Sequence, residues 1–213
     1  MKYSEIYKGW RDNPIEFWKK NAKDVSWIKF PEKILKKKSD YFYEWFSDGI
    51  LNTCYNAVDK NILEGRGDQV AIYYDSPITN SKSKLTYNEL KSKVEEFAGA
   101  LNKYNVSKGD RVIVYMPMIP EAIIAVLAIA RIGAVHSVVF GGFAAKELAV
   151  RIDDCSPKLI ISASCGIEPG RIVEYKPLLD EAIKLSNHKV KNCIIFQREQ
   201  LSVKLNAGLD VSW

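Results

Sequence analysis

The sequence predicts an α/β protein with a mostly parallel sheet, helices on both faces of that sheet, and a helical, aromatic-rich segment in front. Three observations support this. From residue 69 onward, short apolar runs alternate with stretches of helical periodicity, the pattern of βαβ units. The 213 residues are 47% hydrophobic, enough for a packed core. No apolar run approaches the ~20 residues that a membrane span needs, because Arg131 and Gly133 interrupt the richest one.

The front segment, residues 1–62, is irregular and rich in aromatic side chains. Asn13-Pro14 predicts a helix start, with asparagine as the N-cap and proline in the first turn. A second helix is expected over 50–63, where apolar residues recur on one face. We interpret the aromatic residues as the means by which this segment docks on the main domain, with a binding surface as the alternative. The lysine run 36–38 is interpreted as a solvated helix face.

Behind this segment the expected elements follow in a regular order. Thr86 and Glu89 form the capping-box pattern of a helix start, and Gly133 ends an apolar helix. The expected strands cover 70–74, 111–116, 135–140, 157–163 and 192–196. Helices are expected after residue 86 and over 121–131, 144–153 and 177–185, with loops at 75–84 and 164–171.

Charge and cysteine content exclude several classes of protein. The net charge of +5 comes mostly from lysine, whereas planar phosphate recognition favours arginine, so no nucleic acid is expected as a partner. The 4 cysteines have no CxxC spacing and only 2 histidines accompany them, which argues against structural zinc and a disulfide framework. No secretory signal opens the sequence. We therefore expect a protein of the cell interior, with reduced core or loop thiols and no membrane partner.

Ligands of parallel α/β sheets bind beyond the carboxyl ends of the strands, and this rule selects the loops 117–120, 141–143 and 164–171. Gly141 and Gly142 would let a ligand approach the backbone, although a tight turn from strand to helix would also use glycine. In the third loop, Arg171 could clamp an anionic group such as a phosphate. The alternative is a surface ion pair with a neighbouring glutamate, either Glu168 or Glu174.

Other candidate sites have less support. Cys165 with His136 could act as a nucleophile and its base, but we interpret Cys165 as a structural thiol and His136 as a core histidine. The dinucleotide motif GxGxxG and the phosphate-loop motif GxxxxGK[ST] do not occur. The residues by themselves therefore indicate a ligand-binding α/β domain and no specific reaction.

Three segments carry a resemblance to a known family. The stretch 115–154, YMPMIPEAIIAVLAIARIGAVHSVVFGGFAAKELAVRIDD, resembles the N-terminal region of the acetyl-/propionyl-CoA synthetases, which belong to the adenylate-forming acyl-CoA synthetase superfamily. The stretches 51–76 and 162–183 extend the resemblance, and residues 1–62 are similar to the family's N-terminal cap region. It implies that 63–213 is the beginning of the large adenylate-forming, AMP-binding domain.

The resemblance implies a two-step ligase. ATP and a short carboxylate, acetate or propionate, would form an acyl-adenylate and pyrophosphate with Mg in the parent enzyme, and the thiol of coenzyme A (CoA) would then displace AMP. The segments YYDSPIT and SCGIEPGR differ from those of acetate enzymes and favour propionate. Carried over by position, the residues expected to contact CoA are Gly141, Gly142, Glu168, Pro169, Gly170 and Arg171.

The family's ATP phosphate loop, acyl pocket and catalytic lysine have no counterpart in these residues. The resemblance therefore implies an N-terminal fragment that is inactive by itself and has an exposed, aggregation-prone sheet edge. A cytoplasmic location is expected, or the mitochondrial matrix if the source is eukaryotic. The alternative from another class is a non-catalytic module that binds CoA or a nucleotide, or that docks on a partner chain.

Overall fold

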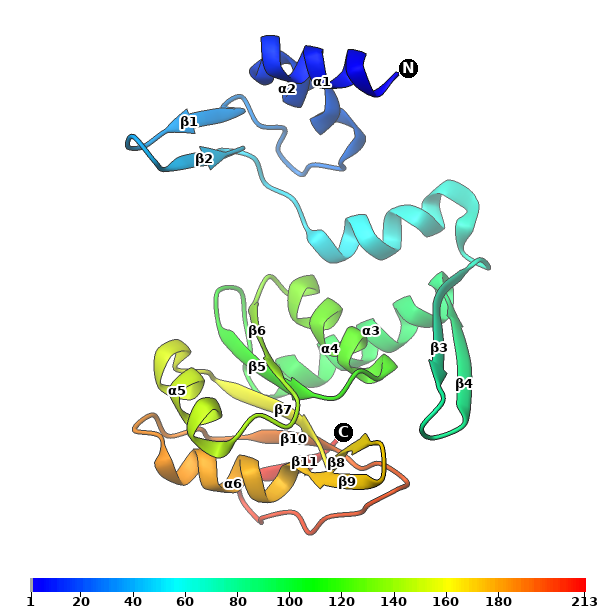
Figure 1. Cartoon of the computed structure of the whole chain (residues 1–213), viewed down its shortest axis with the longest axis vertical. Coiled ribbons are helices and arrows are strands. Elements are labelled where there is room, and N and C mark those ends of the chain that lie inside the picture. The colour runs from blue at the N-terminus through cyan, green and yellow to red at the C-terminus, as the bar shows by residue number, and fades with distance from the viewer. Residues whose placement is uncertain (1) are drawn as a thin grey trace. The chain divides into compact units, whose positions relative to one another are not determined.

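The computed structural model describes residues 2–213 and divides the chain into two compact units (Figure 1). The first unit ends at Lys60 and the second runs from Asn61 to Trp213. The second unit holds the parallel sheet and the candidate site.

The first unit consists of short elements. They are α1 (Tyr3–Asp12), α2 (Pro14–Asn21), a 3₁₀ turn (Ala22–Asp24), β1 (Leu35–Lys37) and β2 (Tyr43–Trp45). The helix start at Asn13-Pro14 is confirmed, because the Asn13 side chain accepts a hydrogen bond from the Glu16 N–H at 3.3 Å. The helix predicted for the lysine run is wrong. Leu35–Lys37 pairs antiparallel with Tyr43–Trp45, so these lysines belong to a hairpin.

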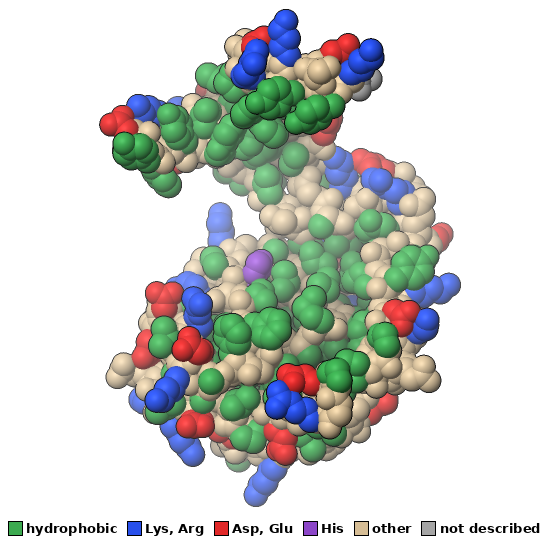
Figure 2. Space-filling view, in the orientation of Figure 1, with side chains coloured by type: hydrophobic (Ala, Val, Ile, Leu, Met, Phe, Trp, Pro, Cys, Tyr) green, Lys and Arg blue, Asp and Glu red, His purple; other side chains and the backbone are tan. Residues whose placement is uncertain are grey.

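Aromatic side chains of the first unit pack on one another. The ring centroids of Trp18 and Trp45 lie 5.7 Å apart, and those of Trp27 and Phe46 lie 5.5 Å apart. Trp45 and Phe46 join the two pairs at 6.0 Å. Since edge-to-face and tilted aromatic pairs at these distances are stabilising, the rings supply a small core for elements too short to bury much surface alone. Figure 2 shows that further apolar side chains of this unit remain on its surface.

The helix expected over 50–63 exists but is shifted, since residues 53–66 are helical. It has π-type turns over Tyr55–Asp59 and Ile62–Arg66, and Gly65 leaves the helical conformation with φ of 83°. A φ in the left-handed region is what glycine tolerates best, so the residue type at this position fits the break in the helix.

A five-stranded sheet forms the centre of the second unit, and all its strand pairs are parallel. Its order is β11-β10-β7-β5-β6. The strands are β5 (Arg111–Met116), β6 (Val135–Phe140), β7 (Leu159–Ala163), β10 (Cys193–Phe196) and β11 (Asp210–Ser212). The strands predicted at 111–116, 135–140, 157–163 and 192–196 are confirmed in this sheet, whereas the strand predicted at 70–74 belongs to a separate two-stranded ribbon. The strand β11 is one that the sequence reasoning missed.

Helices cover both faces of this sheet, as predicted (Figure 1). One face carries α3 (Tyr87–Lys103) and α4 (Pro120–Arg131), and the other carries α5 (Ala145–Cys155) and α6 (Tyr175–Leu185). In β5, Ile113 and Tyr115 pack in one fully buried cluster with Leu148 of α5 and Leu179 of α6. Because every residue from Val112 to Met116 is buried, β5 has apolar contacts on both faces.

The capping box that begins α3 is confirmed. The Thr86 hydroxyl accepts a hydrogen bond from the Glu89 N–H at 3.2 Å, and the Glu89 carboxylate accepts one from the Thr86 N–H at 2.7 Å. The Thr86 N–H and the Thr86 hydroxyl, which donates to the same carboxylate at 3.0 Å, both lower the pKa of Glu89. The cap therefore satisfies two backbone donors that the first turn of the helix leaves open.

Two segments predicted as loops are antiparallel hairpins instead. The expected loop 75–84 contains the end of β3 (Val70–Ser76), the turn, and most of β4 (Ser81–Thr86). The expected loop 164–171 contains β8 (Cys165–Glu168), which pairs with β9 (Arg171–Glu174). Both ribbons contain many polar or exposed residues, so a search for apolar runs does not find them.

The edge strand β6 exposes apolar surface. Val138 and Phe140 are 62% and 71% exposed, and His136, expected in the core, is also exposed, so that expectation is wrong. The cause is the strand's place at the edge of the sheet, where one neighbour is missing. Figure 2 shows hydrophobic side chains open on the surface of the second unit. Within residues 2–213, no helix is both long and apolar enough to span a bilayer.

Candidate functional site

A crevice of about 340 Å³ lies at the carboxyl ends of β5 and β6, where the sheet rule places ligands. It is mostly apolar, with a few polar groups on its wall. The wall includes Met116, Ile119, Val139, Gly141, Gly166, Glu168, Tyr175 and Arg198. This combination of an apolar lining and a small number of polar groups is typical of small-molecule sites.

Tyr175 occupies the space beside two glycines of this crevice. A β-carbon at Gly166 would overlap the Tyr175 hydroxyl and lie 2.8 Å from two ring carbons. A β-carbon at Gly141 would also overlap this hydroxyl and lie 2.8 Å from the Met116 carbonyl oxygen. Gly142 has φ of 90°, a conformation that side chains disfavour. Close packing and turn geometry therefore both require glycine here, in agreement with the turn interpretation, while the ligand interpretation stays a prediction.

The ring of Tyr175 packs against a second tyrosine, Tyr115. The rings of Tyr115 and Tyr175 lie 5.0 Å apart, and the Tyr115 hydroxyl donates to the Phe143 carbonyl at 2.9 Å. Burial, with a smaller contribution from Tyr115, raises the pKa of Tyr175 to about 12. The Tyr175 hydroxyl therefore keeps its proton at neutral pH and is available as a hydrogen-bond donor.

The β8–β9 hairpin presents the charged residues of the site. Pro169 and Gly170 form its turn, and the φ of 77° at Gly170 suits the second central position of a type II turn. The Nε and Nη2 atoms of Arg171 lie 2.8 Å and 2.7 Å from Oε2 of Glu168. The surface ion pair with Glu168 that the sequence allowed is thus present. The Arg171 side chain is 70% exposed and lies outside the lining of the crevice.

The structure brings only part of the predicted set together. Gly141 and Glu168 line the crevice, whereas Arg171 is on the outer strand of the hairpin. Sequence reasoning missed Gly166, Tyr175 and Arg198. The rule used for the other strands could have found Arg198, which follows the carboxyl end of β10.

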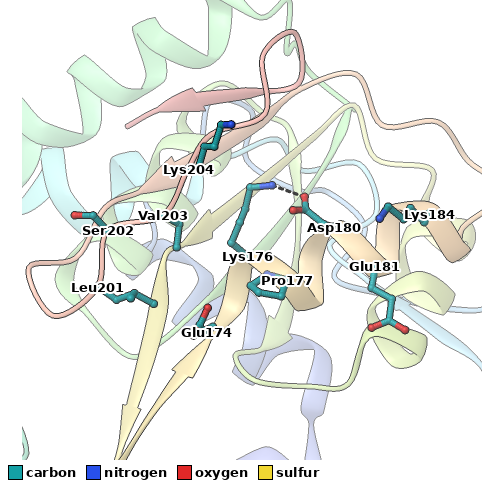
Figure 3. Close-up of a pocket in the computed structure, with 10 residues that line it drawn as sticks. All are labelled: Glu174, Lys176, Pro177, Asp180, Glu181, Lys184, Leu201, Ser202, Val203 and Lys204. Carbon is teal, nitrogen blue, oxygen red and sulfur yellow. Dashed lines mark hydrogen bonds and ion pairs between the residues drawn. The ribbon is translucent and has the colours of Figure 1, made fainter.

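A second cavity, of about 550 Å³, lies between α6 and the segment 201–204 (Figure 3). Its notable group is Lys176, whose side chain is only 5% exposed and forms ion pairs with Asp180 and with Asp210. Nζ of Lys176 lies 2.9 Å from Oδ2 of Asp210, which is itself fully buried. The Asn206 backbone N–H also donates to this carboxylate, at 2.6 Å. Because the charges are paired internally, we interpret the cluster as a structural tie between α6 and β11.

The charges of this cluster alter the titration of its members. Burial by itself lowers the pKa of Lys176, but the hydrogen bonds and charges of Asp180 and Asp210 outweigh it and leave the pKa above its usual value. Burial, helped by the charge of Asp210, raises the pKa of the Cys193 thiol to about 12. Cys193 is therefore an inert core thiol, as the sequence predicted.

Replacing Lys176 tests the tie between α6 and β11. The substitution Lys176→Met leaves Asp210 as a buried carboxylate without its cation, so we expect a loss of about 3–5 kcal/mol in unfolding free energy. Urea unfolding measures this free energy. Lys184→Met, on the exposed face of α6, is the matched control, and its unfolding free energy should lie within about 0.5 kcal/mol of that of the unsubstituted protein.

The ion pairs of Lys176 also make the free energy of unfolding depend on pH in a defined direction. A raised lysine pKa contributes stability that is fully present below the unfolded value of about 10.4 and is lost as the pH rises through the folded value. The unsubstituted protein should therefore lose more stability than the Lys176→Met variant between pH 10 and the onset of alkaline unfolding. Equal losses in both proteins would contradict this role of Lys176.

Gly166→Ala tests the close packing of Tyr175. The new methyl group overlaps the tyrosine, and overpacking of this kind costs about 1–3 kcal/mol. Gly99→Ala, inside α3 with no atom near its β-carbon position, should instead stabilise by about 0.5–1 kcal/mol. Thermal unfolding of both variants and of Gly166→Ala with Tyr175→Phe gives the comparison. A double variant as unstable as Gly166→Ala alone would argue against the hydroxyl contact.

Metal binding has no candidate centre in the part of the chain that the structure describes, since no group of three or more His, Cys, Asp or Glu residues is suitably placed.

Comparison with known proteins agrees with this architecture. The family model described as AMP-binding enzyme matches residues 60–209, and the model described as acetyl-coenzyme A synthetase N-terminus matches residues 3–57. The acyl-CoA synthetase short-chain family member 3, mitochondrial, of Homo sapiens is 50% identical over 202 residues, covering 94% of this chain and 29% of that protein. The acetyl-coenzyme A synthetase of Streptomyces avermitilis is 41% identical, covering 99% of this chain and 32% of that protein.

The solved acetoacetyl-CoA synthetase from Streptomyces lividans matches with a TM-score of 0.86 and 24% identity, over 99% of this chain and 32% of that one. This likeness confirms the fold. The chain thus spans about a third of the length of the relatives that it matches. Since the AMP-binding enzyme model covers most of the sequence, the predicted resemblance is confirmed, and the chain belongs to the AMP-binding enzyme family.

Proposed function

We propose that this chain is the N-terminal portion of an ATP-dependent short-chain acyl-CoA ligase. The observation that carries the proposal is the 50% identity over 94% of the chain to a protein named as a short-chain acyl-CoA synthetase. The parent enzyme would join a short carboxylate to AMP with release of pyrophosphate, and CoA would then displace AMP. Because the chain spans only about a third of such relatives, the fragment by itself is proposed to make no adenylate.

The substrate, location and cofactors of the parent are part of the same proposal. Propionate is favoured over acetate by the segments YYDSPIT and SCGIEPGR. A place in the cytoplasm, or in the mitochondrial matrix of a eukaryote, is proposed, and the mitochondrial label of several relatives supports the second location. ATP and Mg are proposed to be held by the remainder of the parent enzyme.

The CoA contact is proposed at the β8–β9 hairpin and the neighbouring glycine turn. Gly141, Gly142 and the turn Glu168–Arg171 present backbone and one exposed guanidinium beside a crevice. Arg171 is paired with Glu168 at the surface, where an ion pair contributes little stability. A CoA phosphate can therefore take the place of the Glu168 carboxylate, since arginine donates equally well to both groups.

A chimera tests the ligase proposal. This chain would replace the matching segment of the human short-chain family member 3, which is 50% identical to it. We expect the chimera to catalyse carboxylate-dependent exchange of pyrophosphate into ATP, and to do so faster with propionate than with acetate. The isolated chain should show no exchange. A folded chimera without exchange, or exchange by the isolated chain, would contradict the proposal.

Arg171→Gln tests the CoA contact. Loss of a charge-assisted contact to phosphate should weaken CoA binding by about tenfold, measured by calorimetry on the isolated chain. Glu168→Gln removes the competing carboxylate and should strengthen binding. Arg151→Gln, an exposed arginine of α5, is the matched control for charge. Equal effects of Arg151→Gln and Arg171→Gln would count against this site.

A further inference from the structure

Arg198 is a buried cation that has no anionic partner among residues 2–213. It is 9% exposed, and its guanidinium makes one hydrogen bond to the described residues, from Nη1 to the Cys165 carbonyl at 3.3 Å. Its backbone N–H donates to the Ser164 hydroxyl at 2.9 Å, which fixes the start of the side chain. A guanidinium has five N–H donors, and burying its charge without an anion is costly. The arrangement is therefore one that an anion would stabilise.

The Tyr175 hydroxyl is a second unsatisfied donor in the same crevice. Tyr175 is 4% exposed, yet its hydroxyl forms no hydrogen bond with any residue from 2 to 213. The glycines on either side leave the hydroxyl uncovered by side chains, and both Tyr175 and Arg198 line the crevice. Because Tyr175 lines the crevice, its hydroxyl can donate to a group supplied from outside the chain.

The surroundings of Arg198 do not supply its counterion. The residue also lines a neighbouring cavity of about 380 Å³. The carboxylates on the walls of these two cavities belong to Glu121, Glu168 and Glu199, and none of them forms an ion pair with Arg198. Glu168 is instead paired with Arg171. Arg198 lines both cavities and is thus open to a ligand from either one.

We propose that this crevice is an anion-binding subsite in which Arg198 and the Tyr175 hydroxyl donate to one oxyanion, a phosphate or a carboxylate. The apolar wall, including Met116, Val139 and Phe140, would cover an uncharged part of the same ligand. The two donors lie inside the crevice, whose lining also includes Gly141 and Glu168 of the proposed CoA contact, whereas Arg171 lies outside it. The subsite rests on Arg198 and Tyr175 and not on the proposed function.

Titration of the isolated chain tests the subsite. Inorganic phosphate and, separately, propionate would be added at constant ionic strength, with sodium chloride as the reference. A ligand of the folded state raises the unfolding temperature as its concentration passes the dissociation constant, so we expect saturable stabilisation by at least one of the two. Stabilisation by phosphate alone assigns a phosphate site and by propionate alone a carboxylate site. Stabilisation by neither overturns the proposal.

Two variants assign the binding to these donors. Arg198→Gln should weaken anion binding at least about tenfold, and Tyr175→Phe about threefold to tenfold, since hydrogen bonds to charged groups are strong. Arg151→Gln and the exposed Tyr73→Phe are the matched controls and should leave this binding unchanged. Equal weakening by Arg151→Gln would mean general charge attraction and would overturn the assignment.

Should Arg198→Gln fail to fold, Tyr175→Phe still decides, because it removes one unpartnered hydroxyl and retains the ring packing against Tyr115. Unchanged anion affinity in folded Tyr175→Phe would overturn the shared role of the two donors. The CoA measurement on Arg171→Gln is independent of both results, so failure of the hairpin contact and failure of the crevice subsite can be told apart.

Discussion

The close approach of Tyr175 to Gly141 and Gly166 is the contact on which this end of the molecule depends. Three segments meet at that ring, namely the end of β6, the β8–β9 hairpin and the first turn of α6. Any side chain at either glycine would push one of these segments away. The width of the crevice and the position of the hairpin are therefore set by the absence of two β-carbons and the presence of one phenol ring.

The next residue along the chain fixes a different part of the sheet. Tyr175 contacts the carboxyl end of β6, whereas Lys176 reaches Asp210 at the start of β11, the opposite edge strand. The first turn of α6 is thus held in place by the packing of Tyr175 and by the buried ion pair of Lys176. The two contacts are complementary, because packing fixes distance and the ion pair fixes which strand lies alongside.

The sequence was informative where one local signal determined the outcome. The strand β5 is apolar from Val112 to Met116 and β6 is mostly apolar, and the Thr86 capping box and the Asn13-Pro14 helix start behave as short-range chemistry requires. The two polar hairpins were missed, because their strands are defined by backbone ladders and carry no apolar pattern. His136 was misplaced since an apolar run does not tell an edge strand from a central one.

The candidate site was harder to predict for a related reason. Glu168 and Arg171 could be singled out by their residue types, but the approach of Gly141, Gly166 and Tyr175 arises from the packing of segments far apart in the sequence. Arg198 is similar, because its lack of a counterion is a property of the folded chain. The resemblance to a known family supplied the activity, and the structure supplied the neighbours of each residue.

The parallel order of the sheet also constrains how this protein reaches its native state. The strand β5 pairs with β6 and β7, and each of these partners is separated from it by at least one complete helix. No turn of a few residues can therefore start the sheet, and its first strand pair must close a long loop before any contact offsets the lost chain entropy. We expect folding dominated by a slow, late barrier, with the local hairpins and capped helices forming well ahead of the sheet.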